Sequence, residues 1–169
     1  MSEPQIHPLV DQLRFTRSEF RRGLRGTSAD DGVRRVEPMN SIGWIVAHMS
    51  WQEQRYFLTR AQGITPRPEL DGIAPNGGPA TTPPLAAMLA AWKEVTSASD
   101  AWLAEQDGEA LLGPLAPGSS RVLGSAIQRV TYHYWYHTGE ILAIRQVLGN
   151  RRLPEFVGNI DDEAPYRSA

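Results

Sequence analysis

Residues 123–149 read LGSAIQRVTYHYWYHTGEILAIRQVLG, and this stretch decides the fold. His137 lies in the middle of an apolar seam, where an apolar residue would pack better. The other residues of the seam recur at alternating steps of four and three, which is the spacing of one buried helix face: Leu123, Ile127, Val130, Tyr134, Ile141, Ile144 and Leu148. Gly149 and Asn150 follow as a C-terminal stop. The stretch predicts a long helix with a histidine in its buried face.

Three further stretches carry apolar residues at helical spacing and are bounded by residues that start or stop helices. The segments 26–39 and 64–84 between them are polar or dense in Pro and Gly, which is typical of loops. We predict helices near residues 5–24, 41–62, 84–106 and 121–149, then an irregular tail from about residue 151. The expected fold is all-α, a four-helix bundle in a single domain spanning residues 1–169. The long loops leave the directions of the helices open.

Composition excludes several classes of protein. The 169 residues contain no cysteine, so any metal must be held by His, Asp or Glu, and there is no cysteine nucleophile. A formal net charge of -2 argues against a nucleic-acid-binding protein, which needs a basic face. No apolar run is long enough to span a bilayer, and the first residues lack the layout of a signal peptide. We therefore expect a cytoplasmic protein with neither a membrane nor a nucleic-acid partner.

Three of the four histidines fall in the middle of predicted helices. His133 and His137 are four residues apart, so their side chains project side by side from one helix. His48 lies beside the buried stripe of the second helix, whereas His7 near the N-terminus is expected to be exposed. A lone core histidine usually bonds to a neighbour, but three buried imidazoles cost about 1–3 kcal/mol each without partners. One shared divalent metal would satisfy all three and leave an open coordination position.

The segments SIGWIVAHMSWQEQRYF (residues 41–57) and YHYWYHTGEILAIRQVLG (residues 132–149) resemble the DinB/YfiT-like superfamily. The resemblance covers all four predicted helices and includes an HxxxHxGxI signature at His133 and His137, with His48 as the earlier histidine. It implies a DinB-like four-helix bundle in which these three residues bind a metal, zinc or nickel. Some members have Glu as the middle ligand, whereas His133 gives this chain the all-histidine form.

Related members of the superfamily include bacillithiol and mycothiol S-transferases and the mycothiol-dependent maleylpyruvate isomerase. The resemblance therefore implies a divalent-metal-dependent enzyme, an S-transferase or isomerase that uses a low-molecular-weight thiol such as mycothiol on a small-molecule substrate. A metal with neutral ligands also lowers the pKa of bound water, so a metal-dependent hydrolase is an alternative. A non-catalytic metal-binding bundle or stress protein is the alternative from another class.

A few residues near the histidines are further candidates. Glu140, three residues after His137, could orient an imidazole or act as a catalytic base, although helical Glu more often carries an exposed or interhelical charge. Arg55 and Tyr134 are candidate cofactor-binding residues, Arg55 because it could hold an anionic substrate. For Glu53 and Arg55 an ordinary surface salt bridge is the simpler expectation.

The sequence also predicts where a pocket lies and whether the chain forms oligomers. We expect a pocket between the helices at 41–62 and 121–149, with the loop at 64–84 long enough to fold over it. Gly43 and Gly139 lie within these helices, and close helix packing is a sufficient reason for both. Five Trp and five Tyr are many for a bundle of this size, and some should reach the surface. Covering them favours a homodimer.

Overall fold

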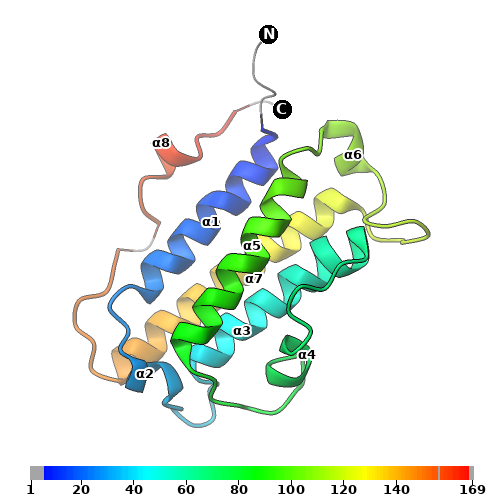
Figure 1. The fold of residues 1–169 in the computed structure, drawn as a ribbon. Helices are drawn as coiled ribbons and strands as arrows, with labels where there is room; N and C mark the ends of the chain where they lie inside the picture. Colours follow the sequence, from blue (N-terminus) through cyan, green and yellow to red (C-terminus); the bar gives the residue numbers. More distant parts are fainter. Residues whose placement is uncertain (1–5, 156, 168–169) are drawn as a thin grey trace.

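Four long helices dominate the computed structural model, which describes residues 6–155 and 157–167 (Figure 1). They are α1 (Pro8–Leu24), α3 (Ile42–Glu53), α5 (Leu85–Leu103) and α7 (Leu123–Val147), and a π-helical segment, η1 (Gln54–Arg60), continues α3. The described residues contain no β-strand, so the prediction of an all-α fold is confirmed. Among them, no helix is long and apolar enough to cross a membrane.

The helix boundaries agree with the prediction to within a few residues, with two kinds of difference. α1 begins at Pro8 because the Nδ1 atom of His7 accepts a hydrogen bond from the backbone of Leu9 and caps the helix. His7 is partly buried in this role and not exposed as expected, and residue 5 lies outside the described residues. Short helices also occur in segments predicted to be irregular: α2 (Ala29–Val33), α4 (Leu70–Ile73), α6 (Gly108–Leu112) and α8 (Ile160–Glu163).

The four long helices form two parallel pairs that run in opposite directions. The most extensive helix contacts are between α1 and α7 and between α3 and α5. Leu9 lies near Gly124 at the start of α7, and Gly23 near the end of α1 lies by Thr138, so α1 and α7 are parallel. Gly32 of α2 packs near the starts of both α3 and α5, so these two helices are also parallel. The structure thus fixes the directions that the loop lengths leave open.

Because α3 and α5 are parallel neighbours, the chain between them returns along the length of the bundle (Figure 1). We call residues 61–84 the crossover segment. It lies against α3: Trp44 Nε1 donates to the carbonyl of Pro79 at 2.9 Å, and Trp51 Nε1 donates to Asp71 at 2.7 Å. With α5, α7 and this segment packed around α3, residues 42–51 are all buried.

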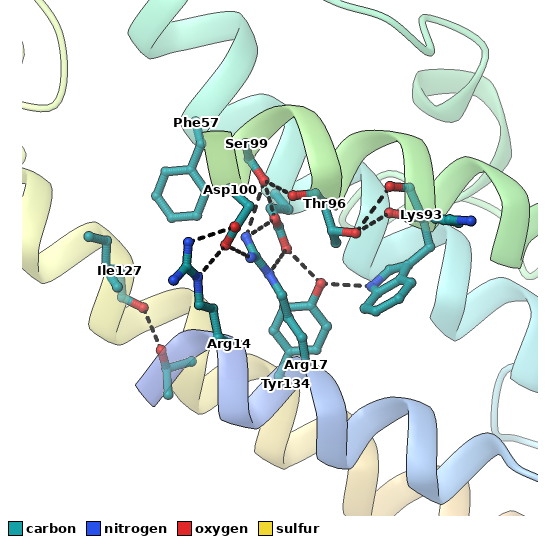
Figure 2. A network of polar contacts seen from close by, with 12 residues as sticks. Arg14, Arg17, Phe57, Lys93, Thr96, Ser99, Asp100, Ile127 and Tyr134 are labelled. Carbon is teal, nitrogen blue, oxygen red and sulfur yellow. Dashed lines mark hydrogen bonds and ion pairs between the residues drawn. The ribbon is translucent and has the colours of Figure 1, made fainter. Parts of the chain in front are cut away.

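A polar network inside the bundle joins all four long helices (Figure 2). Arg17 of α1 forms ion pairs with Glu53 of α3 and, at 2.9 Å, with Asp100 of α5. Glu53 also accepts hydrogen bonds from the hydroxyl of Ser99 and, at 2.6 Å, from that of Tyr134 on α7. The network therefore links α1, α5 and α7 to one carboxylate on α3, that of Glu53.

The expectation of a surface salt bridge is wrong for Glu53, whose side chain is completely buried. A buried carboxylate is costly unless its charge and its lone pairs have partners. Arg17, Ser99 and Tyr134 supply those partners from three other helices. Burial and the charge of Glu53 raise the pKa of Tyr134 well above its ordinary value, so the phenol keeps the proton that it donates.

Candidate metal centre

The structure brings His48, His133 and His137 together between α3 and α7. One ring nitrogen of each residue lies within 4.8 Å of the others, which makes the three a group that could hold one metal ion. The His133 and His137 ring centroids are 4.5 Å apart, and those of His48 and His133 are 5.1 Å apart. His133 and His137 lie one turn apart on α7, which runs antiparallel to α3. The two helices therefore bring the three rings to the same level of the bundle.

His48 is held from three sides. Its Nδ1 lies 2.9 Å from the carbonyl oxygen of Ala74 in the crossover segment, and because a carbonyl only accepts, Nδ1 carries the proton. Its ring stacks on Trp44 with centroids 4.8 Å apart and on Trp51 at 5.5 Å. These contacts fix both the tautomer and the plane of the ring, which leaves Nε2 as the free lone pair.

His133 and His137 are oriented by side chains in the same way. The Nδ1 atom of His133 donates to Gln52 Oε1 at 2.6 Å, and that of His137 donates to the carboxylate of Glu140 at 2.7 Å. The Nε2 atoms of the two rings then face each other 2.9 Å apart. Two lone pairs at this separation repel unless a cation or a proton lies between them. Metal-binding histidines in proteins commonly donate their second ring N–H to a carbonyl, an amide or a carboxylate, as all three do here. The three Nε2 atoms therefore fit a divalent ion.

Burial keeps the imidazoles of His48 and His133 neutral, which metal binding requires. Burial lowers the pKa of His48, and the nearby His137 lowers it further. Burial, together with His137, His48 and Arg129, lowers the pKa of His133 to about 3. Around pH 7 both rings are therefore available as neutral ligands without first losing a proton.

A cavity of about 550 Å³ lies beside the cluster, and His48 and His133 form part of its wall. The other walls come from α3 with η1, from α7 with the loop before it, and from Pro75 and Asn76 of the crossover segment. The cavity thus opens between the two histidine-bearing helices. Arg55 lines it and lies over the Trp51 ring at 5.1 Å from the centroid, with no salt bridge to any described residue.

The other residues singled out from the sequence are placed differently. Glu140 bonds to His137, which is the orienting role and not the exposed charge that the sequence favours. Tyr134 faces away from the histidines: its hydroxyl donates to Glu53 and accepts from Trp92 Nε1, and it does not line the cavity. Gly139 has open space where a Cβ would be, so close packing does not explain it.

Sequence reasoning missed the groups that orient the rings from other segments. Gln52 gave a weak signal, since it follows His48 by one helical turn on the side that faces α7. The carbonyl of Ala74 gave none, because any residue has a carbonyl and only the crossover segment brings this one to His48. Three more arginines line the cavity and also went unnoticed: Arg60, Arg121 and Arg129.

A helical bundle with convergent histidines on two facing helices defines a class of proteins in which the bundle core can hold a metal ion. The sequence comparison narrows the class. The DinB superfamily matches residues 12–141, which is more than half of the chain and includes all three histidines. The chain therefore belongs to the DinB superfamily. No curated protein sequence matches it.

Proposed function

We propose that the protein is a divalent-metal-dependent enzyme that uses a low-molecular-weight thiol, as an S-transferase or isomerase. The observation that carries this proposal is the arrangement of the three imidazoles: each Nδ1 is bonded to a protein acceptor, and the cluster borders a cavity. His48, His133 and His137 would hold zinc or nickel, since imidazole suits both. A divalent ion there would act as a Lewis acid and lower the pKa of a thiol or of water.

The open side of the cluster favours catalysis over a purely structural metal. Among the described residues, only the three histidines form the group that could hold an ion. Glu140 does not close it, because its carboxylate bonds to Nδ1 of His137, on the opposite edge of the ring from Nε2. In this proposal Glu140 is a positioning residue, as are Gln52 and the carbonyl of Ala74. Three protein ligands and one free position are the pattern of catalytic sites.

Support for a thiol cosubstrate comes from the resemblance to thiol-dependent enzymes and from the chain itself. It has no cysteine, so a thiol must be supplied by a small molecule such as mycothiol. A cavity of about 550 Å³ is within the usual range for small-molecule sites. A cytoplasmic location would suit this chemistry, because the cytosol keeps thiols reduced.

The test compares the wild type with His137→Ala, and with His7→Ala as a matched control at the histidine outside the cluster. Each protein is titrated with zinc and nickel and then assayed with mycothiol or bacillithiol and a model electrophile. We expect His137→Ala to lose metal binding and thiol transfer, and His7→Ala to keep both. Metal-independent transfer, or transfer unaffected by His137→Ala, would contradict the proposal.

A hydrolase is the second candidate, because the same open position could activate water. Ester and amide substrates run in the same assay without thiol decide between the two. Metal-dependent hydrolysis that needs no thiol would favour the hydrolase. Tight metal binding with neither activity would favour a structural site.

We also propose that two copies of the chain form a homodimer through the outer face of α7. Tyr132 and Tyr136 are one helical turn apart there, and their side chains are 67% and 71% exposed. Exposed tyrosines of this kind are typical of protein interfaces. Light scattering at micromolar concentration should give twice the monomer mass for the wild type. The mass measured for Tyr136→Ser should be lower. A monomeric wild type would overturn this assignment.

A further inference from the structure

Four arginines line the cavity beside the histidine cluster: Arg55, Arg60, Arg121 and Arg129. They come from η1, from α7 and from the loop before α7, so three separate segments of the fold bring arginines to one cavity. No carboxylate of the described residues lines the same cavity. A concave surface with charges of one sign concentrates its field and attracts ligands of the opposite sign. This local charge contrasts with the net charge of -2 of the whole chain.

The four guanidinium groups are not neutralised within the part of the chain that the structure describes. None of them forms an ion pair or a side-chain hydrogen bond there. Six arginines elsewhere in the described residues are paired with carboxylates: Arg14, Arg17, Arg22, Arg35, Arg67 and Arg167. The carboxylates close to the histidine site are already engaged, Asp71 by Trp51 and Glu140 by His137. The cavity therefore has several cationic groups and no internal anion to match them.

Aromatic rings hold three of these arginines in place. Arg55 lies over Trp51 at 5.1 Å from the ring centroid, and Arg60 and Arg121 lie over Tyr56 at 5.3 Å and 5.1 Å. A guanidinium group that lies over an aromatic ring interacts with the face of that ring. This contact leaves the N–H donors at the edge of the guanidinium group unused. Those donors match the geometry of carboxylate and phosphate oxygens. Three of the four arginines are thus held by aromatic rings, and their N–H donors are available to an oxyanion.

We propose that this cavity binds the carboxylate or phosphate group of a small molecule, with the rest of that molecule directed at His48 and His133. The inference rests on the proposed function, because it makes the thiol or its electrophilic partner an anionic compound. The size of the cavity limits the ligand to a small molecule. In this proposal the arginines anchor the anionic group, and His48 and His133 line the same cavity.

The first test measures binding of inorganic phosphate and of succinate to the metal-free protein by calorimetry at low ionic strength. Arg129→Gln and Arg60→Gln each remove one charge from the cavity. Arg34→Gln is the matched control, since Arg34 is exposed, unpaired among the described residues and absent from the cavity. We expect each cavity variant to weaken binding about tenfold, the usual effect of losing a hydrogen bond to a charged group. The control should bind like the wild type.

The preference between the two probes identifies the anion: tighter phosphate binding indicates a phosphate ligand, and tighter succinate binding a carboxylate. Binding of neither probe, or equal binding by all variants, would overturn the proposal. A short single-stranded oligonucleotide is a further arm. If it binds far more tightly than either probe and loses affinity in the same variants, the site is for a nucleic acid and the small-molecule assignment is wrong.

This test separates the anion site from the metal site. Anion binding that depends on the arginines, in a protein that binds no zinc or nickel, would leave this inference standing and refute the proposed function. If metal binding requires His137 but the arginine variants bind anions as the wild type does, this inference is refuted and the proposed function stands. Once an activity is found, Arg129→Gln should raise KM for an anionic substrate and leave KM for its neutral ester unchanged.

Discussion

Glu53 is a carboxylate whose side chain has no contact with solvent, so its burial is costly unless its charge is paired. Its partners Arg17, Ser99 and Tyr134 come from three different helices, so its position depends on the whole bundle being assembled. It also follows Gln52, which orients His133. The network therefore holds α3 in register with α7 next to the histidine cluster.

We predict that Glu53→Gln destabilises the protein by about 3–5 kcal/mol, because it leaves the buried charge of Arg17 without its main partner. Urea unfolding at pH 7 measures the difference. Glu69→Gln is the control: Glu69 pairs with Arg67 at the surface, and its loss should cost less than about 1 kcal/mol. Similar values for the two variants would contradict the role given to the network.

The histidines also make the stability of the metal-free protein depend on pH. Burial is the main reason that the pKa of His133 falls to about 3 in the folded protein, against about 6.5 in an unfolded chain. Between these two values the unfolded chain binds a proton that the folded protein does not, so stability falls as pH decreases. Above about pH 7 this residue has no such effect.

We therefore expect the chelator-treated protein to lose stability from pH 7.5 to pH 5, as measured by urea unfolding at each pH. His133→Gln cannot titrate, so its stability should change less over the same range. The pKa of His48 is lowered in the same direction and should leave part of the slope in that variant. An identical slope in both proteins would show that His133 is not held neutral.

At this scale the sequence predicts the ligands but not the groups that orient them. His48, His133 and His137 are visible because an imidazole in an apolar helical seam is unusual. Gln52 and the carbonyl of Ala74 become partners only when α7 and the crossover segment pack against α3. Glu53 is misjudged for the same reason, since its partner Arg17 is 36 residues away along the chain.

At the scale of elements, the prediction of one regular helix over residues 41–62 misses the π-helical segment η1. Side-chain periodicity reports which face is buried, and it carries little information on whether hydrogen bonds run to the fourth or the fifth residue. The segment matters for the site because Arg55, Tyr56 and Arg60 of η1 line the cavity. π-Helical turns are frequent at functional sites, which agrees with this placement.

Two glycines in the histidine-bearing helices should respond in opposite ways to the same substitution. A Cβ on Gly43 would lie 2.2 Å from the carbonyl oxygen of Pro83, whereas one on Gly139 would meet nothing within 4 Å. We predict that Gly43→Ala destabilises the protein by about 1–3 kcal/mol through this clash. Gly139→Ala should stabilise it by about 0.5–1 kcal/mol, because alanine favours the helix.

Thermal and urea unfolding of the two glycine variants against the wild type measure both effects. The close contact at Gly43 holds the start of α3 against the chain that leads into α5. A neutral Gly43→Ala would mean that this contact can relax. A destabilising Gly139→Ala would mean that something covers the exposed face of α7 at this point, as a second copy of the chain would.

The arrangement of elements shows where helical periodicity stops being informative. Four stripes of apolar residues predict four helices, and each stripe predicts which face is buried. Direction depends on where each connection ends, and a connection of the length of residues 61–84 allows either choice. The parallel pairing of α3 and α5 makes the crossover segment run along α3, which is how a backbone carbonyl reaches His48.

For the whole molecule, the apolar core and the candidate metal site are separate sources of stability. The core contains buried side chains from all four long helices, among them Val10, Met49, Trp92 and Ile127. The histidines occupy one position between α3 and α7, and the apolar seam continues on both sides of His137 through Val130 and Ile141. We therefore expect the bundle to fold without a metal ion, unlike a small domain whose core is held by a metal.

We predict that removing the metal leaves the bundle folded but lowers its melting temperature. A ligand present at 100 times its Kd stabilises the folded state by about 2.7 kcal/mol, and for a chain of this size that corresponds to a shift of about 5–10 °C. Circular dichroism should show the same helical signal with EDTA as with zinc, and a lower but still cooperative transition. His137→Ala should melt at one temperature in both conditions, because it has lost a ligand. If EDTA abolishes the helical signal, the metal is structural and the proposal of an enzyme is weakened. If zinc raises the melting temperature of His137→Ala as much as that of the wild type, the ion binds elsewhere.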